Sequence, residues 1–230
     1  MAKERILVIE DEEDLVEVMS YNLKRAGFDV RAAKNGVDGL KRARQDGADL
    51  VLLDLMLPDV DGLEVCRRLR RDPLTAQLPV IMVTAEGEES DVVLGLGVGA
   101  DDYIPKPFSP KELVARVKAV LRRGPPRGEE GPPERVVRGG LLVDASRHEV
   151  LLDGEPVPLT ATEFRLLHFL AAHPGRVFTR DQLLRRVMGE HVVLVDRNID
   201  VHVRAIRQKL GEARGLIETV RGVGYRFKDL

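Results

Sequence analysis

Residues 50–58, LVLLDLMLP, place the carboxylate of Asp54 at the end of an uninterrupted apolar run. A short apolar run bounded by polar or turn residues is typical of a strand that is buried on both faces of a parallel sheet. Four further short segments with strand character occur in the first half of the chain, at residues 6–9, 29–32, 80–83 and 103–104. Several of the segments between and after them have the periodicity of amphipathic helices. This alternation predicts an α/β domain with a doubly wound, five-stranded parallel sheet.

Polar side chains follow these runs at the carboxyl ends of the predicted strands, the edge where such sheets place their sites. They are Glu10, Asp11, Asp54, Thr84 and Lys106. Three carboxylates held close together repel one another, and an all-oxygen cluster favours a hard cation, so we expect Mg²⁺ as the cofactor. With this charge offset, Asp54 can attack a phosphoryl group while Thr84 and Lys106 bind its oxygens. The cluster therefore predicts aspartyl-phosphate chemistry.

The chain divides at residues 124–134, where four prolines and three glycines occupy seven of the eleven positions. We expect a first domain over 1–123, a semi-rigid linker over 124–134 and a second domain over 135–230. The first 124 residues contain 19 Lys and Arg against 23 Asp and Glu, whereas the rest contain 17 against 15. From 176 to 228 the basic residues outnumber the acidic ones by six, which favours a nucleic-acid partner for the second domain.

No part of the sequence contains the about 18 to 20 consecutive apolar residues that a membrane helix needs. Charged residues occupy positions 3–5, where a signal peptide would become apolar. We therefore expect a cytoplasmic protein with no membrane partner. The single cysteine, Cys66, can form neither an internal disulfide nor a structural zinc site.

The second half begins with predicted short strands at 141–143 and 149–152. Helical patterns follow, and two of them open with a typical N-terminal capping box. The boxes are TATE at 160–163 and TRDQ at 179–182. Strands followed by helices predict an α+β domain.

The third predicted helix, from 196 or 197 to 210, has two different faces. Its apolar stripe contains Ile199, Val203, Ile206 and Leu210. The opposite face is basic, and a terminal β-hairpin with Arg221 near its tip follows. Three helices and an arginine-bearing hairpin predict a winged helix-turn-helix with double-stranded DNA as its partner. The alternative is a solvated basic face in an ordinary domain.

Five short motifs of the first half occur together in one family. They are VIEDE at 8–12, LLDLMLP at 52–58, DG at 61–62, TA at 84–85 and KPF at 106–108. With them, residues 4–122 resemble the flavodoxin-like receiver domain of bacterial two-component response regulators. The resemblance implies a cis peptide bond between Lys106 and Pro107, and a sensor histidine kinase as the phosphodonor.

The same resemblance implies a role for each polar residue at the sheet edge. Asp54 is expected to be the phosphoacceptor, and Lys106 to bind the phosphoryl group. Thr84 and Tyr103 resemble the pair of switch residues through which the family reports phosphorylation. The implied metal ligands are Glu10 (through water), Asp11, Asp54 and the carbonyl of Met56.

Four motifs of the second half carry a second resemblance. They are LTATEF at 159–164, DQLL at 181–184, VDRNIDVHV at 195–203 and TVRGVGYRF at 219–227. Together they resemble the effector domain of the OmpR/PhoB subfamily, and residues 107–117 are most similar to the PhoB subgroup. The resemblance implies that residues 189–195 match a loop that some members present to RNA polymerase. The implied DNA contacts are Arg197, Asn198, His202, Arg204, Arg207 and Arg221.

The resemblance also implies that phosphorylated receivers form a homodimer. The matching face contains Val92, Asp101, Asp102, Glu112, Arg116 and Lys118. Val92 departs from the family, which has a basic residue there as the partner of an acidic one. We expect apolar contacts of Val93 and Leu96 to replace this ion pair. Ala205 likewise stands where relatives carry a base-reading arginine, which leaves the operator sequence open.

The expected function is phosphorylation-activated transcription regulation. A histidine kinase transfers a phosphoryl group to Asp54, and this drives dimerisation and binding to direct-repeat promoter DNA. One alternative is an atypical regulator whose receiver works without phosphorylation, and the complete acidic cluster counts against it. The other is an enzyme that uses an aspartyl phosphate on a small substrate. That enzyme would need a substrate pocket and an additional general acid, and the sequence indicates neither.

Overall fold

The computed structural model describes residues 3–85, 98–121, 133–188 and 197–229. The chain forms two compact units, Met1–Leu121 and Arg122–Leu230, and each has its own hydrophobic core. Most of the predicted linker lies outside the described residues. Within the described ranges, no helix combines the length and the apolar character needed to cross a membrane.

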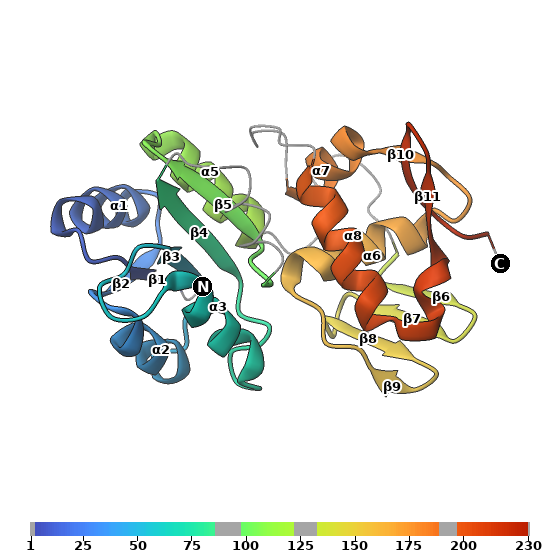
Figure 1. Cartoon of the computed structure of the whole chain (residues 1–230), viewed down its shortest axis with the longest axis horizontal. Helices are drawn as coiled ribbons and strands as arrows, with labels where there is room; N and C mark the ends of the chain where they lie inside the picture. The colour runs from blue at the N-terminus through green and yellow to red at the C-terminus, as the bar shows by residue number, and fades with distance from the viewer. Residues whose placement is uncertain (1–2, 86–97, 122–132, 189–196, 230) are drawn as a thin grey trace. The chain divides into compact units, whose positions relative to one another are not determined.

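The first unit contains the predicted five-stranded parallel sheet, with strand order β2-β1-β3-β4-β5 (Figure 1). Its strands are β1 (Arg5–Ile9), β2 (Asp29–Ala33), β3 (Leu50–Asp54), β4 (Val80–Ala85) and β5 (Asp102–Lys106). Strand β5 is longer than the apolar run at 103–104 indicated, because its backbone pairs with β4 from Asp102 to Lys106. Hydrophobic patterns report the buried centre of a strand and miss its polar ends.

Helices cover both faces of this sheet, which confirms the doubly wound fold (Figure 1). Helices α1 (Glu13–Arg25) and α5 (Pro110–Leu121) lie on one face, and α2 (Gly36–Gln45) and α3 (Gly62–Arg71) lie on the other. Gly39 lets α2 approach the sheet closely, because a Cβ at this position would come within 2.5 Å of Cδ1 of Ile9. Each of α1, α2 and α3 follows a strand of the parallel sheet, so the loops that enter these helices lie at the carboxyl edge of the sheet.

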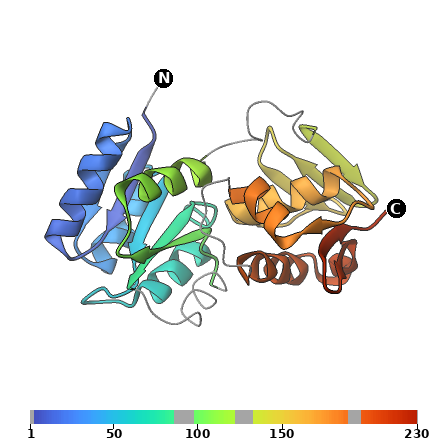
Figure 2. The same cartoon turned by 90° about the horizontal axis from the view of Figure 1, so that it is seen from above.

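The second unit begins with a four-stranded antiparallel sheet in the order β6-β7-β8-β9. Its strands are β6 (Arg135–Arg138), β7 (Leu141–Asp144), β8 (Glu149–Leu152) and β9 (Glu155–Pro156). The sequence predicted the two central strands and missed the edge strands, whose short, charged segments lack a clear apolar pattern. In Figure 2 this sheet and helix α8 (Arg197–Lys209) lie on opposite sides of α6 (Ala161–Ala172).

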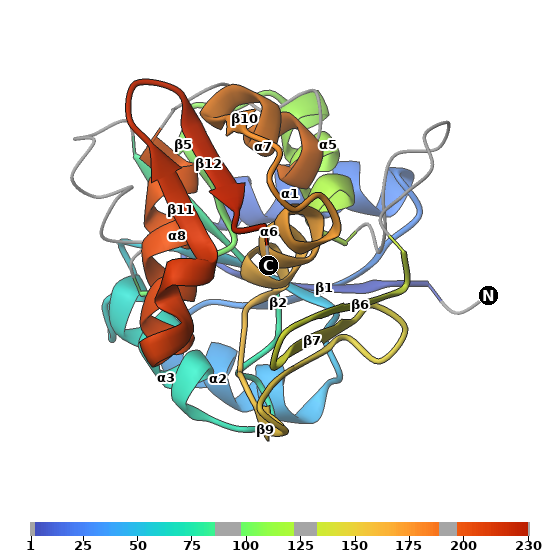
Figure 3. The ribbon, with the colours of Figure 1, turned by 90° about the vertical axis from the view of Figure 1, so that its right-hand side faces the viewer.

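The predicted winged helix-turn-helix is present in the second unit. Helix α7 (Arg180–Met188) precedes α8, and a short 3-10 helix, η1 (Gly211–Leu216), leads into the hairpin of β11 (Ile217–Val220) and β12 (Gly224–Phe227). Strand β10 (Phe178–Thr179) pairs with the other side of β12, and Figure 3 shows the hairpin beside α8. The apolar stripe is buried as predicted, at 0–1% exposure for Ile199, Val203 and Ile206 of α8 and for Leu210 directly after it.

Both predicted capping boxes are also present. At α6, Thr160 N–H donates to Oε2 of Glu163 at 2.8 Å, and Glu163 N–H donates to Oγ1 of Thr160 at 3.4 Å. At α7, Thr179 N–H donates to Oε1 of Gln182 at 2.9 Å, and the reciprocal bond is 3.2 Å long. The starts of both helices are thus determined by local sequence.

Candidate functional site

Three carboxylates meet at the carboxyl edge of the parallel sheet. Glu10 follows β1, Asp11 opens the next loop, and Asp54 ends β3, the neighbour of β1. The three residues can each present one carboxylate oxygen within 4.8 Å of the others. Glu10 and Asp54 are buried, at 1% and 3% exposure, whereas Asp11 is exposed. The cluster therefore has two buried anions and one side that faces solvent.

Lys106, at the end of β5, lies against both buried carboxylates. Its Nζ is 2.9 Å from Oε2 of Glu10 and 3.2 Å from Oδ1 of Asp54. Burial, assisted by the charge of Asp54, raises the pKa of Glu10 although the ammonium group opposes this effect. Burial lowers the pKa of Lys106, but the two carboxylates outweigh it and the pKa is raised overall. Lys106 is thus a stable cation, and the peptide bond to Pro107 is cis, as the resemblance implied.

The donor set fits a hard divalent cation. One lysine faces three carboxylates, so negative charge remains to be offset, and every available ligand is an oxygen. Glu10, Asp11 and Asp54 could hold the cation. Met56 follows Asp54 by two residues, and because its 76% exposed side chain is a thioether, only its backbone carbonyl suits this ion.

Thr84 and Tyr103, the expected switch residues, lie on the neighbouring strands β4 and β5, and both are 8% exposed. The guanidinium carbon of Arg116 lies 6.0 Å from the ring centroid of Tyr103. Burial raises the pKa of the Tyr103 hydroxyl, and the nearby Arg116 opposes this effect. The aromatic ring is therefore packed inside the receiver in this structure.

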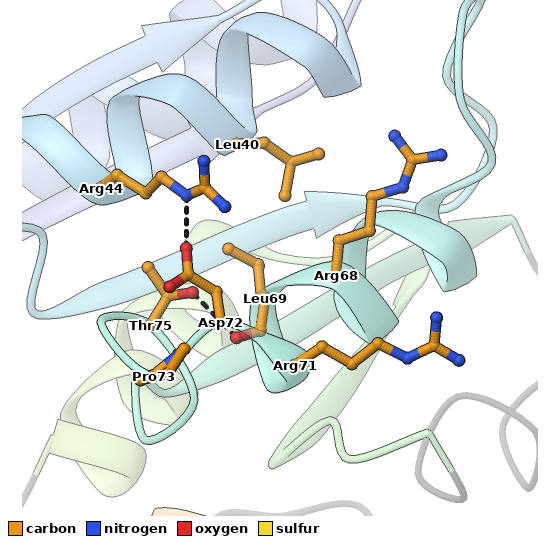
Figure 4. A pocket seen from close by; sticks show the side chains of 8 residues that line it. All are labelled: Leu40, Arg44, Arg68, Leu69, Arg71, Asp72, Pro73 and Thr75. Carbon is orange, nitrogen blue, oxygen red and sulfur yellow. Dashed lines mark hydrogen bonds and ion pairs between the residues drawn. The ribbon is translucent and has the colours of Figure 1, made fainter.

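A hollow of about 500 Å³ lies elsewhere on this unit, where α2 and α3 end (Figure 4). Three arginines line it, but Arg44 is paired with Asp72, and Nε of Arg68 lies 2.9 Å from Oε1 of Glu64. Helices α2 and α3 start at the carboxyl edge of the sheet, so their ends lie at the opposite edge from Asp54. The hollow takes no part in the carboxylate site.

Two family matches cover most of the chain. Residues 6–118 match the family described as response regulator receiver domain, and residues 154–227 match the family described as transcriptional regulatory protein, C terminal. The chain is 48% identical over 228 residues to the phosphate regulon transcriptional regulatory protein PhoB of Pseudomonas aeruginosa, with 99% of this chain and 98% of that protein covered. The chain is a response regulator of the OmpR/PhoB family. This response regulator therefore combines a receiver domain with a DNA-binding effector domain.

Solved structures agree with this assignment. The regulator is similar to a mutant of RitR, with a TM-score of 0.76, 29% identity, and 99% and 100% of the two chains covered. It is also similar to DrrB, a Thermotoga maritima OmpR/PhoB homologue, with a TM-score of 0.52, 32% identity and the same coverage. The curated relative is named as a transcriptional regulator. The chain is accordingly a transcription regulator and not an enzyme that acts on a small substrate.

Charged receiver residues that were expected at the dimer face are engaged within the subunit. Arg116 is 2% exposed, and its Nη1 donates to both carboxylate oxygens of Asp102, at 3.2 and 3.0 Å. Its Nη2 also donates to Oε1 of Glu112 at 3.0 Å. Asp102 itself is 1% exposed. Arg116 pairs inside the subunit because α5 lays it directly over the start of β5, and the place of these residues in a dimer face stays a prediction.

Asp101 is likewise an internal residue, with 0% exposure. Its Oδ2 accepts from Nη2 of Arg70 at 3.0 Å and from the N–H of Val80 at 3.0 Å. Lys118 is exposed, and Val92 lies outside the described residues. A contribution of this face to the dimer stays a prediction.

The effector residues expected to contact DNA fall into distinct groups. Arg204 and Arg221 are exposed, so both are free to reach a phosphate or a base. His202 is 1% exposed in this structure, and its approach to bases stays a prediction. It lies three residues after Ile199 and four before Ile206, and this spacing places it on the buried face of α8.

Arg207 has a structural contact that the sequence did not indicate. Its Nη2 donates to the carbonyl of Ile217 at 2.7 Å and to Oγ1 of Thr219 at 2.9 Å, which ties α8 to β11. Arg197 and Asn198 lie in the first turn of α8, and their DNA contacts stay predictions. The expected polymerase loop at 189–195 lies outside the described residues.

Proposed function

We propose that a sensor histidine kinase transfers a phosphoryl group to Asp54 and that the phosphorylated regulator binds direct-repeat promoter DNA as a dimer. The observation that carries this proposal is the convergence of Glu10, Asp11, Asp54 and Lys106 at one edge of the sheet. An aspartate beside two further carboxylates and a single ammonium group can accept a phosphoryl group only if more positive charge is available. Mg²⁺ is therefore part of the proposal.

Mg²⁺, when held by the three carboxylates and the carbonyl of Met56, supplies charge that offsets the repulsion between Asp54 and the phosphoryl group. A carboxylate oxygen of Asp54 forms the new P–O bond as the P–N bond to the phosphohistidine of the kinase breaks. Lys106 Nζ, 3.2 Å from Oδ1 of Asp54, is within reach of a phosphoryl oxygen bonded there. Thr84 offers a hydroxyl donor from the next strand, and we assign the conformational readout to Thr84 and Tyr103.

The effector domain supplies the output. The exposed Arg204 on α8 and Arg221 between β11 and β12 are suited to phosphate or base contacts, and we retain Arg197, Asn198 and Arg207 in the contact set. The similar protein of Pseudomonas aeruginosa is named for the phosphate regulon, which supports the proposal that this regulator controls genes of phosphate supply. The loop at 189–195 is the proposed contact with RNA polymerase.

Intact-protein mass spectrometry after incubation with acetyl phosphate and Mg²⁺ tests the central step. The wild type is expected to gain one phosphoryl group, and Asp54→Asn none. Asp61→Asn is the matched control, because Asp61 ends the loop that follows Asp54. It caps α3 by accepting from Leu63 N–H at 2.8 Å, a bond that asparagine can keep. Undiminished modification of Asp54→Asn would refute the assignment.

A further inference from the structure

The loop at 55–61 connects the phosphoacceptor to α3, and both of its ends are fixed to the sheet edge. Leu55 N–H donates to the carbonyl of Val83 at 3.2 Å, and Gly62 N–H donates to the carbonyl of Leu55 at 3.0 Å. A Cβ at Gly62 would come within 2.2 Å of the carbonyl oxygen of Asp54, so α3 starts in direct contact with the phosphoacceptor backbone. The ends of the loop therefore have little freedom.

Asp59 ties the middle of the loop to a different element. Its Oδ1 accepts from Gly36 N–H at 2.8 Å, and its Oδ2 accepts from Val37 N–H at 3.0 Å. These two N–H groups belong to the first turn of α2, so no carbonyl group of the helix accepts from them. The helix dipole also favours an anion at this end. Desolvation alone would raise the pKa of Asp59, but these bonds outweigh it and hold the pKa below its usual value. Asp59 is therefore an anionic clamp at neutral pH.

The two hydrogen bonds of Asp59 are not the only cap at the start of α2. Asn35 already caps this helix, since its Oδ1 accepts from Asp38 N–H at 2.8 Å. The loop also packs closely on the helix, because a Cβ at Gly36 would come within 3.2 Å of Cβ of Val60. Helix α2 is thus capped from its own loop and is additionally bonded to the loop that follows the phosphoacceptor.

We propose that Asp59 is a positioning residue for Mg²⁺: it holds the loop so that the Met56 carbonyl stands at the acidic cluster before the cation binds. This inference rests on the metal site of the proposed function. Met56 lies between two anchors, two residues after Asp54 and three before Asp59. A ligand on an unrestrained loop loses conformational freedom when it coordinates a cation, whereas a pre-organised ligand has already lost it. The clamp therefore increases the affinity for Mg²⁺ without touching the ion.

Isothermal titration calorimetry of the full chain with MgCl₂, in the absence of any phosphodonor, tests the inference. Asp59→Ala is expected to raise the Kd for Mg²⁺ about tenfold, at the lower end of the range for groups that orient metal ligands. Asp59→Asn keeps an oxygen that can accept from one of the two N–H groups, so its Kd is expected to stay near that of the wild type. Asn35→Ala is the matched control, since it removes a cap from the same helix without releasing the loop. It is expected to lower the melting temperature and leave the Kd unchanged.

Each contrary outcome has a definite meaning. An unchanged Kd in Asp59→Ala would overturn the inference and leave the proposed function standing, because Asp54 could still be phosphorylated. Equal losses in Asp59→Ala and Asp59→Asn would show that the loop is held only by both carboxylate oxygens together, which supports the clamp. A loss in Asn35→Ala equal to that in Asp59→Ala would assign the effect to general loosening of α2 and overturn the clamp. A wild type that binds no Mg²⁺ would overturn both the inference and the proposed metal site.

Discussion

Replacing Arg116 by methionine is expected to destabilise the receiver domain strongly before any dimer forms. The Arg116 guanidinium lies 3.0 Å from Asp102, and the side chains of the two residues are only 2% and 1% exposed. Burial lowers the pKa of Arg116, but Asp102 outweighs it and raises the pKa, so the arginine is charged at every accessible pH. Methionine retains most of the aliphatic stem and removes only the cation. The change therefore isolates the loss of the charge that faces Asp102.

The magnitude follows from the burial of the pair. Removing one partner of a buried ion pair costs about 3–5 kcal/mol, because the remaining charge is no longer compensated. The contact with Glu112, whose side chain is 23% exposed, adds at most about 1 kcal/mol. This loss is large beside the about 5–15 kcal/mol of a whole domain. Asp102→Asn combined with Arg116→Met leaves neither charge behind and is expected to recover most of the loss.

Urea unfolding of residues 1–121, followed by circular dichroism, measures the free energies of this double-mutant cycle. Arg67→Met is the matched control, because Arg67 is an exposed arginine on α3, and its substitution is expected to change stability by about 0.5 kcal/mol or less. A loss of about 1 kcal/mol or less for Arg116→Met, the size typical of an exposed pair, would refute the reasoning.

Arg221→Ala should weaken DNA binding and reduce the slope of log K against log salt by about one. Arg226→Ala should change this slope less, because the Arg226 guanidinium already pairs with Glu218 at 2.7 Å. Identical slopes for the wild type and Arg221→Ala would exclude a wing contact. Burial holds the pKa of His168 below its usual value although the carbonyl of Pro133 opposes this, so the effector should lose stability as the pH falls below about 6.5, and His168→Gln should flatten that dependence in thermal unfolding. An unchanged pH profile in the variant would rule out His168 as the cause. Sedimentation equilibrium of the phosphorylated receiver should show a dimer with weak salt dependence, because Asp102 and Arg116 are neutralised inside the subunit. Dissociation by moderate salt would instead show that intersubunit ion pairs hold the dimer.

Much of this protein could be predicted from local sequence. The apolar run that ends at Asp54 indicated a buried strand, and the capping boxes at Thr160 and Thr179 located the starts of two helices, because these features depend on residues that are close in the chain. The carboxylate site could also be predicted from the sequence. Once the strands are parallel, their carboxyl ends must share one edge, so Glu10 and Lys106 are brought together by topology alone.

The partners of the remaining charged residues were decided by tertiary structure. Arg70 lies in the basic run at 67–71, and its neighbours in the chain do not indicate its hydrogen bond to the buried Asp101. Arg116 was expected at a dimer face and His202 at a DNA interface, and both are buried in this structure. Nothing close to Asp59 in the sequence indicated its hydrogen bond to the start of α2. The sequence gives the type of each residue and therefore its ordinary charge. Its burial and its partner depend on which distant elements pack against it. For this reason the sequence determined where the carboxylate site lies, and only the packed structure determined which charged residues are paired inside the domain.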